Sequence, residues 1–202
     1  MEKIDLKTHL YHGIVDWRFY AMKLDRREFC LDKLESILKS RYISRPCDFE
    51  EFGVNHNDYF GAKSSDYTNN DNQYYTYVAF HPDSIFASRF HNREKSCYLI
   101  ATEDSRFGII LSPRLIDELP IEEESFDDSE VVIADNISLD QYGVGIYINP
   151  IFANEDDFQR IKAMINQNQY PFPIINIQNG EVVESIEKGK IKSLSSYTET
   201  GN

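Results

Sequence analysis

The 202-residue sequence contains no apolar run that approaches the roughly 20 residues needed to span a bilayer. Residues 1–5 also lack the apolar core of a secretory signal. We therefore expect a soluble, cytoplasmic protein. Export as an effector or toxin, by machinery that uses no such signal, stays open.

Cysteine is scarce: Cys30, Cys47 and Cys97 are widely spaced and form no CxxC pair. This pattern argues against a disulfide scaffold and against a zinc or redox motif. Cys30 and Cys97 lie in apolar patterns and are expected to pack as small hydrophobic residues. Cys47 lies in a predicted loop, and nothing in the sequence marks any of these thiols as a nucleophile.

Several catalytic motifs are absent, namely GxxxxGK(S/T), GxGxxG, HExxH, GxSxG and the EF-hand loop. These absences argue against the common nucleotide-binding and protease classes. His9 and His12 lie three positions apart, which on a strand directs their side chains to opposite faces. We therefore predict no metal site.

Basic residues are outnumbered, with 21 Lys and Arg against 34 Asp and Glu, so the formal net charge is −13. The resulting field repels phosphate backbones and anionic membrane surfaces. We expect neither nucleic acid nor membrane as a partner, and a basic protein target fits better. The oligomeric state does not follow from these counts.

Apolar residues are plentiful, at 41% of the sequence with 13% aromatic, so the chain can build one hydrophobic core. Strands outnumber the short helices and alternate irregularly with them, which predicts an α+β fold. We expect one domain over residues 1–187, ending in a helix and a β-hairpin, and a flexible tail over residues 188–202. The expected strands are residues 8–15, 74–80, 97–101, 107–111, 130–137 and 142–148, the expected helices are 26–40, 82–90, 113–119 and one after Asn154, and the hairpin joins 173–178 to 181–185 through Asn179-Gly180.

Three segments resemble, in the same order, those of the ADP-ribosyltransferase superfamily in its histidine-tyrosine-glutamate branch, the branch of diphtheria toxin and the poly(ADP-ribose) polymerases. The first is Tyr11-His12-Gly13-Ile14 on a strand, followed by a helix with Leu34, Ile37, Leu38 and Ser40. The second is the strand 76–80 followed by Ser84, Ala87 and Phe90, and the third is Ser129 to Ile137 followed by Tyr142 and residues 146–148. Together they touch most of residues 10–150. The resemblance implies a split pair of antiparallel or mixed sheets with short flanking helices.

The resemblance also implies a site and a reaction. His12, Gly13 and Tyr77 would bind NAD as a substrate, and Glu130 would be the catalytic residue of a transferase that modifies a protein and releases nicotinamide. A carboxylate beside the nicotinamide ribose stabilises the positive charge that develops as the glycosidic bond breaks. His12 would form a hydrogen bond with a ribose hydroxyl of the adenosine half. Tyr77 would stack on nicotinamide, and the alternatives for that role are Tyr59, Tyr74 and Tyr75.

Some features depart from the family or favour another function. Residues 15–25 lengthen the connection between the histidine strand and its helix, and the hairpin lies outside the fold's core. Asp128 lies two residues before Glu130, as in arginine-modifying members, but those members usually have Arg where this chain has His12, so the acceptor residue stays open. The alternatives are an acidic immunity or antitoxin protein that binds a basic partner through residues such as 122–128, and a transferase fold that has lost turnover.

Overall fold

The computed structural model describes residues 3–14, 27–54, 71–81, 83–84, 102, 105–122, 130–187 and 190–193. Five of the segments named above therefore lie wholly or largely outside the described residues. They are the connection over 15–25, the predicted helix over 82–90, the predicted strand over 97–101, the acidic stretch over 122–128 and the predicted tail over 188–202. None of the helices in the described ranges is long and apolar enough to cross a membrane.

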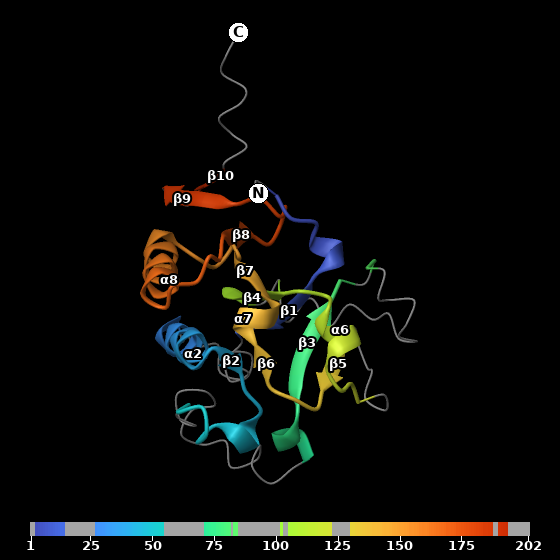
Figure 1. The fold of residues 1–202 in the computed structure, drawn as a ribbon. Coiled ribbons are helices and arrows are strands. Elements are labelled where there is room, and N and C mark those ends of the chain that lie inside the picture. Colours follow the sequence, from blue (N-terminus) through green and yellow to red (C-terminus); the bar gives the residue numbers. More distant parts are fainter. Residues whose placement is uncertain are drawn as a thin grey trace, which may run out of the picture.

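The centre of the fold is a six-stranded mixed sheet with the order β5-β3-β1-β4-β7-β8 (Figure 1). Neighbouring strands are antiparallel except for β7 and β8, which are parallel. The sheet and its helices confirm the α+β prediction. The strands are β1 (Leu10–Gly13), β3 (Thr76–Phe80), β4 (Phe107–Leu111), β5 (Glu130–Ile133), β7 (Gly143–Ile148) and β8 (Ile174–Asn176).

The remaining elements flank this sheet. Two further sheets have two strands each, β2 with β6 and β9 with β10. The long helices α2 and α8 lie side by side on one side of the central sheet in Figure 1, and an ion pair joins them from Arg27 to Asp157. The remaining bounds are η1 (Leu6–Thr8), α2 (Arg27–Ser40), β2 (Tyr42–Ile43), η2 (Pro46–Asp48), η3 (Asp71–Tyr74), α6 (Leu115–Glu118), β6 (Ile137–Ser138), α7 (Leu139–Tyr142), α8 (Glu155–Gln167), β9 (Val183–Glu187) and β10 (Lys190–Ser193).

The two faces of the central sheet carry different cores, because successive side chains on a strand point to opposite faces. The main core includes Leu10 of β1 together with Leu34 of α2 and Ile161 of α8. The opposite face carries a smaller cluster that includes Tyr11 and its register partners Ala79 and Ile110. Helices α2 and α8 therefore cover the face on which Leu10, and with it His12, lies.

The predicted helix after Asn154 is confirmed, and Asn154 caps its start. The Asn154 side chain accepts a hydrogen bond from the Asp157 amide at 3.1 Å, and the Asp157 carboxylate accepts one from the Asn154 amide at 2.9 Å. This reciprocal pair satisfies two amides at the helix start that have no partner within the helix. Phe158, Ile161 and Ile165 then recur at helical spacing and are buried.

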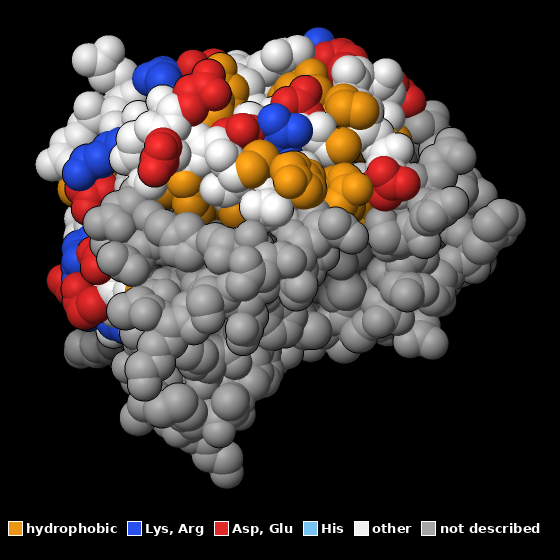
Figure 2. All heavy atoms as spheres, turned by 90° about the horizontal axis from the view of Figure 1, so that it is seen from below, with side chains coloured by type: hydrophobic (Ala, Val, Ile, Leu, Met, Phe, Trp, Pro, Cys, Tyr) orange, Lys and Arg blue, Asp and Glu red, His pale blue; other side chains and the backbone are white. Residues whose placement is uncertain are grey.

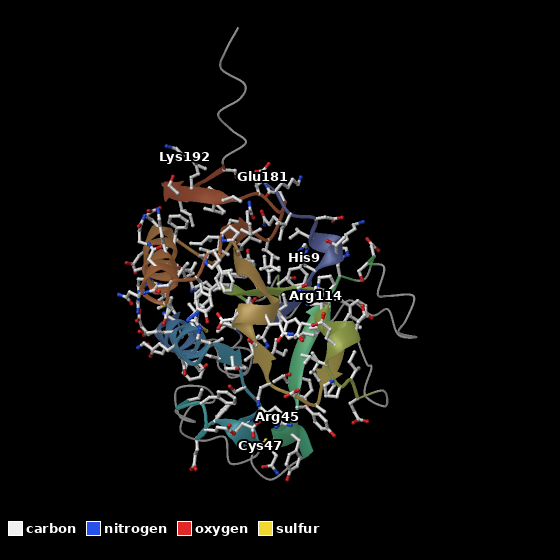
Figure 3. The ribbon with its side chains drawn as sticks, in the orientation of Figure 1. His9, Arg45, Cys47, Arg114, Glu181 and Lys192 are labelled. Carbon is white, nitrogen blue, oxygen red and sulfur yellow. The ribbon has the colours of Figure 1, made fainter. Side chains whose placement is uncertain are left out.

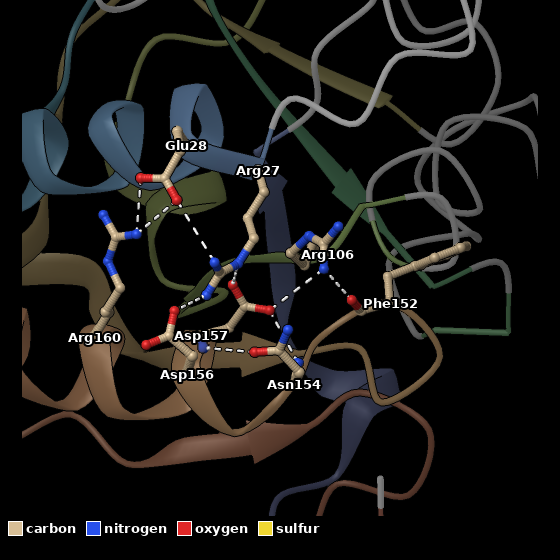
Figure 4. Close-up of polar contacts among 8 residues, drawn as sticks. All are labelled: Arg27, Glu28, Arg106, Phe152, Asn154, Asp156, Asp157 and Arg160. Carbon is tan, nitrogen blue, oxygen red and sulfur yellow. Dashed lines mark hydrogen bonds and ion pairs between the residues drawn. The ribbon is translucent and has the colours of Figure 1, made fainter.

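A buried ion-pair network joins the starts of α2 and α8 (Figure 4). The Asp157 carboxylate has no exposed surface and accepts hydrogen bonds from Arg27 and from Arg106, the latter at 3.3 Å. At the surface, Glu28 of α2 pairs with Arg160 of α8 at 2.8 Å. Since Arg106 immediately precedes β4, the network fixes α2, α8 and the central sheet relative to one another.

The C-terminal segment differs from the predicted hairpin. The turn at Asn179-Gly180 forms, with Gly180 at a φ of 77° and its amide donating to the Asn176 carbonyl. Beyond the turn the two arms share one bridge, between Ile175 and Val182. Strand β8 pairs with β7, and β9 pairs with β10. Residues 190–193, which we assigned to a flexible tail, instead form β10.

Candidate functional site

The three strands that carry the sequence-predicted site residues are adjacent in the central sheet, in the order β5-β3-β1. Glu130 begins β5 and pairs in register with Ala79 of β3, which in turn pairs with Tyr11 of β1. His12 follows Tyr11, and Tyr77 lies two residues before Ala79. The fold therefore gathers the positions of His12, Gly13, Tyr77 and Glu130 on three neighbouring strands, although they are far apart in the sequence.

The pairing of β1 with β3 stops just before His12. The register pairs are Leu10 with Phe80 and Tyr11 with Ala79, and no pair between these two strands follows them among the described residues. On its other side β1 stays paired with β4 as far as Gly13 and Gly108. The backbone ladder between β1 and β3 thus ends at Tyr11, and we call the place beyond it, from His12 onward, the β1–β3 opening.

The His12 side chain bridges the β1–β3 opening. Its Nδ1 atom lies 2.9 Å from the carbonyl oxygen of Tyr77. A carbonyl oxygen can only accept, so Nδ1 carries the proton, and in a neutral imidazole Nε2 is then an acceptor. Nε2 is shielded from solvent and has no hydrogen-bond partner in the described part of the chain. An unpartnered buried acceptor is a place where a ligand donor gains a full hydrogen bond.

The environment of His12 keeps the imidazole neutral. Burial, followed by the positive charge of Lys33, lowers the pKa of His12 to about 4, and the hydrogen bond to the Tyr77 carbonyl only partly opposes this shift. At neutral pH the side chain is therefore uncharged. It is suited to accept a hydrogen bond, and it is a poor site for direct contact with an anion.

Gly13 directs its backbone polar groups toward β3. The Ile14 amide donates to the Phe107 carbonyl at 3.2 Å, which marks Ile14 and Phe107 as facing residues that bond directly across β1 and β4. In an antiparallel pair the bonded and non-bonded positions alternate, so the Gly13 amide and carbonyl point away from β4 and into the β1–β3 opening.

Gly108 supports this arrangement from the far side of β1, and the sequence analysis did not identify it. A Cβ atom at Gly108 would collide with the Tyr147 hydroxyl and the His12 carbonyl oxygen. The Tyr147 hydroxyl is held 2.6 Å from the Ser105 hydroxyl. Glycine at this position therefore lets the Tyr147 ring lie close against the strand that carries His12.

The Tyr77 ring does not lie on the same face as the His12 ring. Tyr77 lies between Thr76 and Val78, which are buried, and Val78 belongs to the main core. Strand alternation places the Tyr77 ring on the opposite face, so its contact with His12 is made by the Tyr77 backbone. A ligand that touches both side chains must therefore pass through the β1–β3 opening and cannot lie on one face of the sheet.

The alternative tyrosines fall in different surroundings. Tyr74 ends η3 and is 50% exposed, and Tyr75 is partly buried just before β3. Tyr59 lies outside the described residues.

Lys33 is a second feature that the sequence analysis missed. It belongs to α2, whose other buried residues are all apolar, and only 9% of its surface is exposed. The other lysines whose side chains are described, Lys3, Lys7, Lys39, Lys162 and Lys192, are exposed. A buried lysine was not apparent because the helical spacing of Leu31, Leu34 and Ile37 suggests an apolar stripe that excludes position 33.

Cys47 lies at the lower end of the molecule, close to Arg45 (Figure 3). Partial burial, and then its contact with the Asp48 carboxylate, raise the pKa of the thiol. A raised pKa lowers the fraction of reactive thiolate, so these surroundings do not favour Cys47 as a nucleophile.

Seen from below, hydrophobic side chains on the described part of the surface are interspersed with acidic and basic ones (Figure 2).

Comparisons with known proteins add no assignment, because no protein-family model, curated protein or solved structure matches the chain. Among the described residues, no group of three or more His, Cys, Asp and Glu side chains is placed to hold a metal ion.

Proposed function

We propose that this protein is an NAD-dependent ADP-ribosyltransferase that modifies a protein target and releases nicotinamide. The observation that carries the proposal is the β1–β3 opening, where His12, Gly13 and Tyr77 meet and where β5 brings Glu130 to the neighbouring strand. The sequence resemblance points to the same four residues, His12, Gly13, Tyr77 and Glu130.

His12 and Gly13 would hold the NAD molecule. The neutral imidazole accepts a hydrogen bond at Nε2 from a ribose hydroxyl, which is the donor that this buried atom lacks. The Gly13 amide and carbonyl form a donor and acceptor pair that suits the carboxamide of nicotinamide. The absence of a side chain at Gly13 leaves room for a ring to approach the backbone.

Glu130 would supply the catalytic charge. As the bond between the ribose carbon and the nicotinamide nitrogen breaks, its electron pair leaves with nicotinamide and positive charge develops on the ribose. A carboxylate stabilises that charge more in the transition state than in bound NAD, which lowers the barrier. A nucleophilic side chain of the target then bonds to the ribose carbon and loses its proton.

The target would be a basic protein. The formal net charge of −13 favours encounter with a positively charged partner. Every arginine whose side chain is described is already ion-paired with a carboxylate of the same chain, so these arginines do little to attract an acidic partner. The pairs involve Arg27, Arg41, Arg45, Arg106, Arg114 and Arg160.

The test measures nicotinamide release and label transfer from NAD in a cell lysate. We expect Glu130→Gln to lower both rates by about 100-fold or more, a typical effect of removing one electrostatic stabiliser of a transition state. Glu51→Gln makes the same change at an exposed turn position and should match the wild type. Equal activity of Glu130→Gln and wild type would rule out the assignment of the catalytic residue.

The acidic binding protein remains the alternative, supported by the same net charge. Calorimetry with NAD separates the two functions. A transferase binds NAD and loses binding in His12→Ala, whereas an immunity or antitoxin protein shows no heat of NAD binding in either form. NAD binding that is retained without turnover would identify a transferase fold that has lost catalysis.

A further inference from the structure

The first half of β3 is held by one neighbouring strand. Strand β5 pairs with β3 from Thr76 to Ala79, whereas β1 pairs with it only at Ala79 and Phe80 in the described part of the chain. The Tyr77 carbonyl points toward His12 on β1, so the backbone groups of Thr76 point the other way, toward β5. The position of the Tyr77 carbonyl relative to His12 therefore depends on what holds the start of β3.

The Thr76 side chain holds the start of β3 beyond the strand ladder. Thr76 is 3% exposed, and its hydroxyl donates to the Asp135 carbonyl at 2.9 Å, with the Ile133 carbonyl 3.4 Å away. A hydroxyl has a single proton, so the shorter contact is the principal hydrogen bond. Ile133 is the last residue of β5, and Asp135 lies in the bend that follows it. The residue immediately before Tyr77 is thereby fastened to the segment beyond β5.

The segment beyond β5 is itself anchored, by Arg45 and Asp48. The Arg45 guanidinium donates to the Ala134 carbonyl at 3.2 Å, and the Arg45 amide donates to the Asn136 side chain at 2.6 Å. The Asp48 carboxylate pairs with Arg45 at 2.7 Å and accepts from the Asn136 side chain at 2.7 Å. Thr76 therefore ties β3 to a segment whose position is fixed by several hydrogen bonds.

We propose that Thr76 is a positioning residue for the His12 imidazole. By fastening the start of β3, its hydroxyl keeps the Tyr77 carbonyl within hydrogen-bond distance of His12 Nδ1, 2.9 Å in the structure. The hydrogen bond at one ring nitrogen decides which tautomer a neutral histidine adopts. Acting through the Tyr77 carbonyl, Thr76 keeps the proton on Nδ1 and leaves Nε2 as the acceptor. The effect on NAD binding rests on the proposed function, whereas the effect on the tautomer does not.

The experiment measures the His12 tautomer in the protein without NAD, from the nuclear magnetic resonance shifts of its ring nitrogens at neutral pH. The signals that His12→Gln removes identify His12. We expect the wild type to hold the Nδ1-protonated form. Thr76→Val keeps the branched shape without the hydroxyl, and the loss of one hydrogen bond should raise the ratio of the Nε2-protonated to the Nδ1-protonated form about fivefold. Thr76→Ser returns the hydroxyl and should restore the wild-type ratio.

Thr8→Val is the matched control, because the Thr8 hydroxyl also donates to a backbone carbonyl at 2.9 Å, that of Asp5, before the start of β1. It should leave the His12 tautomer unchanged. Asn136→Ala loosens the segment beyond β5 without altering β3 and should shift the tautomer as Thr76→Val does, so it decides the question if Thr76→Val does not fold. An unshifted tautomer in the deciding variant, an equal shift in Thr8→Val, or a wild type that is mainly Nε2-protonated would overturn the role of Thr76.

Calorimetry with NAD then tests the link to the proposed function. Thr76→Val should weaken NAD binding by about fivefold, whereas Thr76→Ser and Thr8→Val should bind NAD as the wild type does. A shifted tautomer with unchanged NAD affinity would overturn the link between Thr76 and the NAD site. Wild-type protein that binds no NAD would instead overturn the proposed function, and the tautomer would still decide whether Thr76 positions His12.

Discussion

The Nδ1 atom of His12 and the carbonyl oxygen of Tyr77 lie 2.9 Å apart, although strand pairing between β1 and β3 has already ended at Tyr11. The His12 imidazole thus links β1 to β3 just beyond the last backbone pair of the two strands. The contact fixes the tautomer, and it turns the unbonded nitrogen into an acceptor that a bound hydroxyl can satisfy.

The lowered pKa of His12 makes the stability of the fold depend on pH. With a folded-state pKa of about 4 and an unfolded value near 6.5, the unfolded chain binds more protons between these values, so stability rises with pH through this window. As pH falls from 7 to 4, His12 should cost the wild type about 3 kcal/mol of unfolding free energy. Urea unfolding at both pH values measures the loss.

The matched variant for this prediction is His12→Gln, which has no titrating side chain. Between pH 7 and pH 4 its unfolding free energy should fall less than that of the wild type, and the difference between the two falls should equal the His12 contribution. Parallel pH profiles for the two proteins would show that the imidazole is not held neutral.

Gly108→Ala should destabilise the protein and disturb the site. The added methyl group overlaps the Tyr147 hydroxyl and the His12 carbonyl oxygen, and the latter belongs to the backbone and cannot rotate away. We expect a loss of about 1 to 3 kcal/mol in unfolding free energy, which is typical of overpacking in a well-packed interior, together with weaker NAD binding.

Adding Tyr147→Leu to Gly108→Ala tests the cause. Leucine lacks the hydroxyl that the added methyl group meets. Gly108→Ala should therefore lower the unfolding free energy less in the Tyr147→Leu background than in the wild type. The contact with His12 should prevent full recovery. If the second substitution gives no relief at all, the collision with Tyr147 is not the source of the destabilisation.

Much of the fold could be predicted from local pattern. The short apolar run over 107–111, the apolar spacing after residue 26 and the Asn154 cap each report on residues close in sequence, and β4, α2 and α8 lie where these signals put them. The pairing partner of a strand could not be predicted in this way. Asn179-Gly180 makes its turn, but β8 pairs with β7 and β9 pairs with β10, and the local turn signal identifies neither pairing.

The candidate site was likewise predictable only in part from the sequence. The sequence analysis selected His12, Gly13, Tyr77 and Glu130, and the strand order sets their strands side by side. It did not show that the His12 and Tyr77 side chains point to opposite faces, because this depends on the register between strands that are far apart in sequence. The role of Gly108 likewise depends on a ring from β7, which no local pattern reveals.

The last prediction concerns the network that fixes α2 against the sheet. The Asp157 carboxylate has no exposed surface and accepts from Arg27, Arg106 and the Asn154 amide. Asp157→Asn keeps the size of the side chain but leaves two arginines without their shared anion. Breaking a buried ion pair in this way should cost about 3 to 5 kcal/mol of unfolding free energy.

Asp156→Asn is the matched control, because the neighbouring carboxylate also pairs with Arg27 but is 65% exposed. Solvent screens an exposed pair, so this variant should lose less than about 1 kcal/mol. Urea unfolding of both variants at neutral pH gives the comparison. Equal losses would mean that burial of Asp157 does not set the strength of the network.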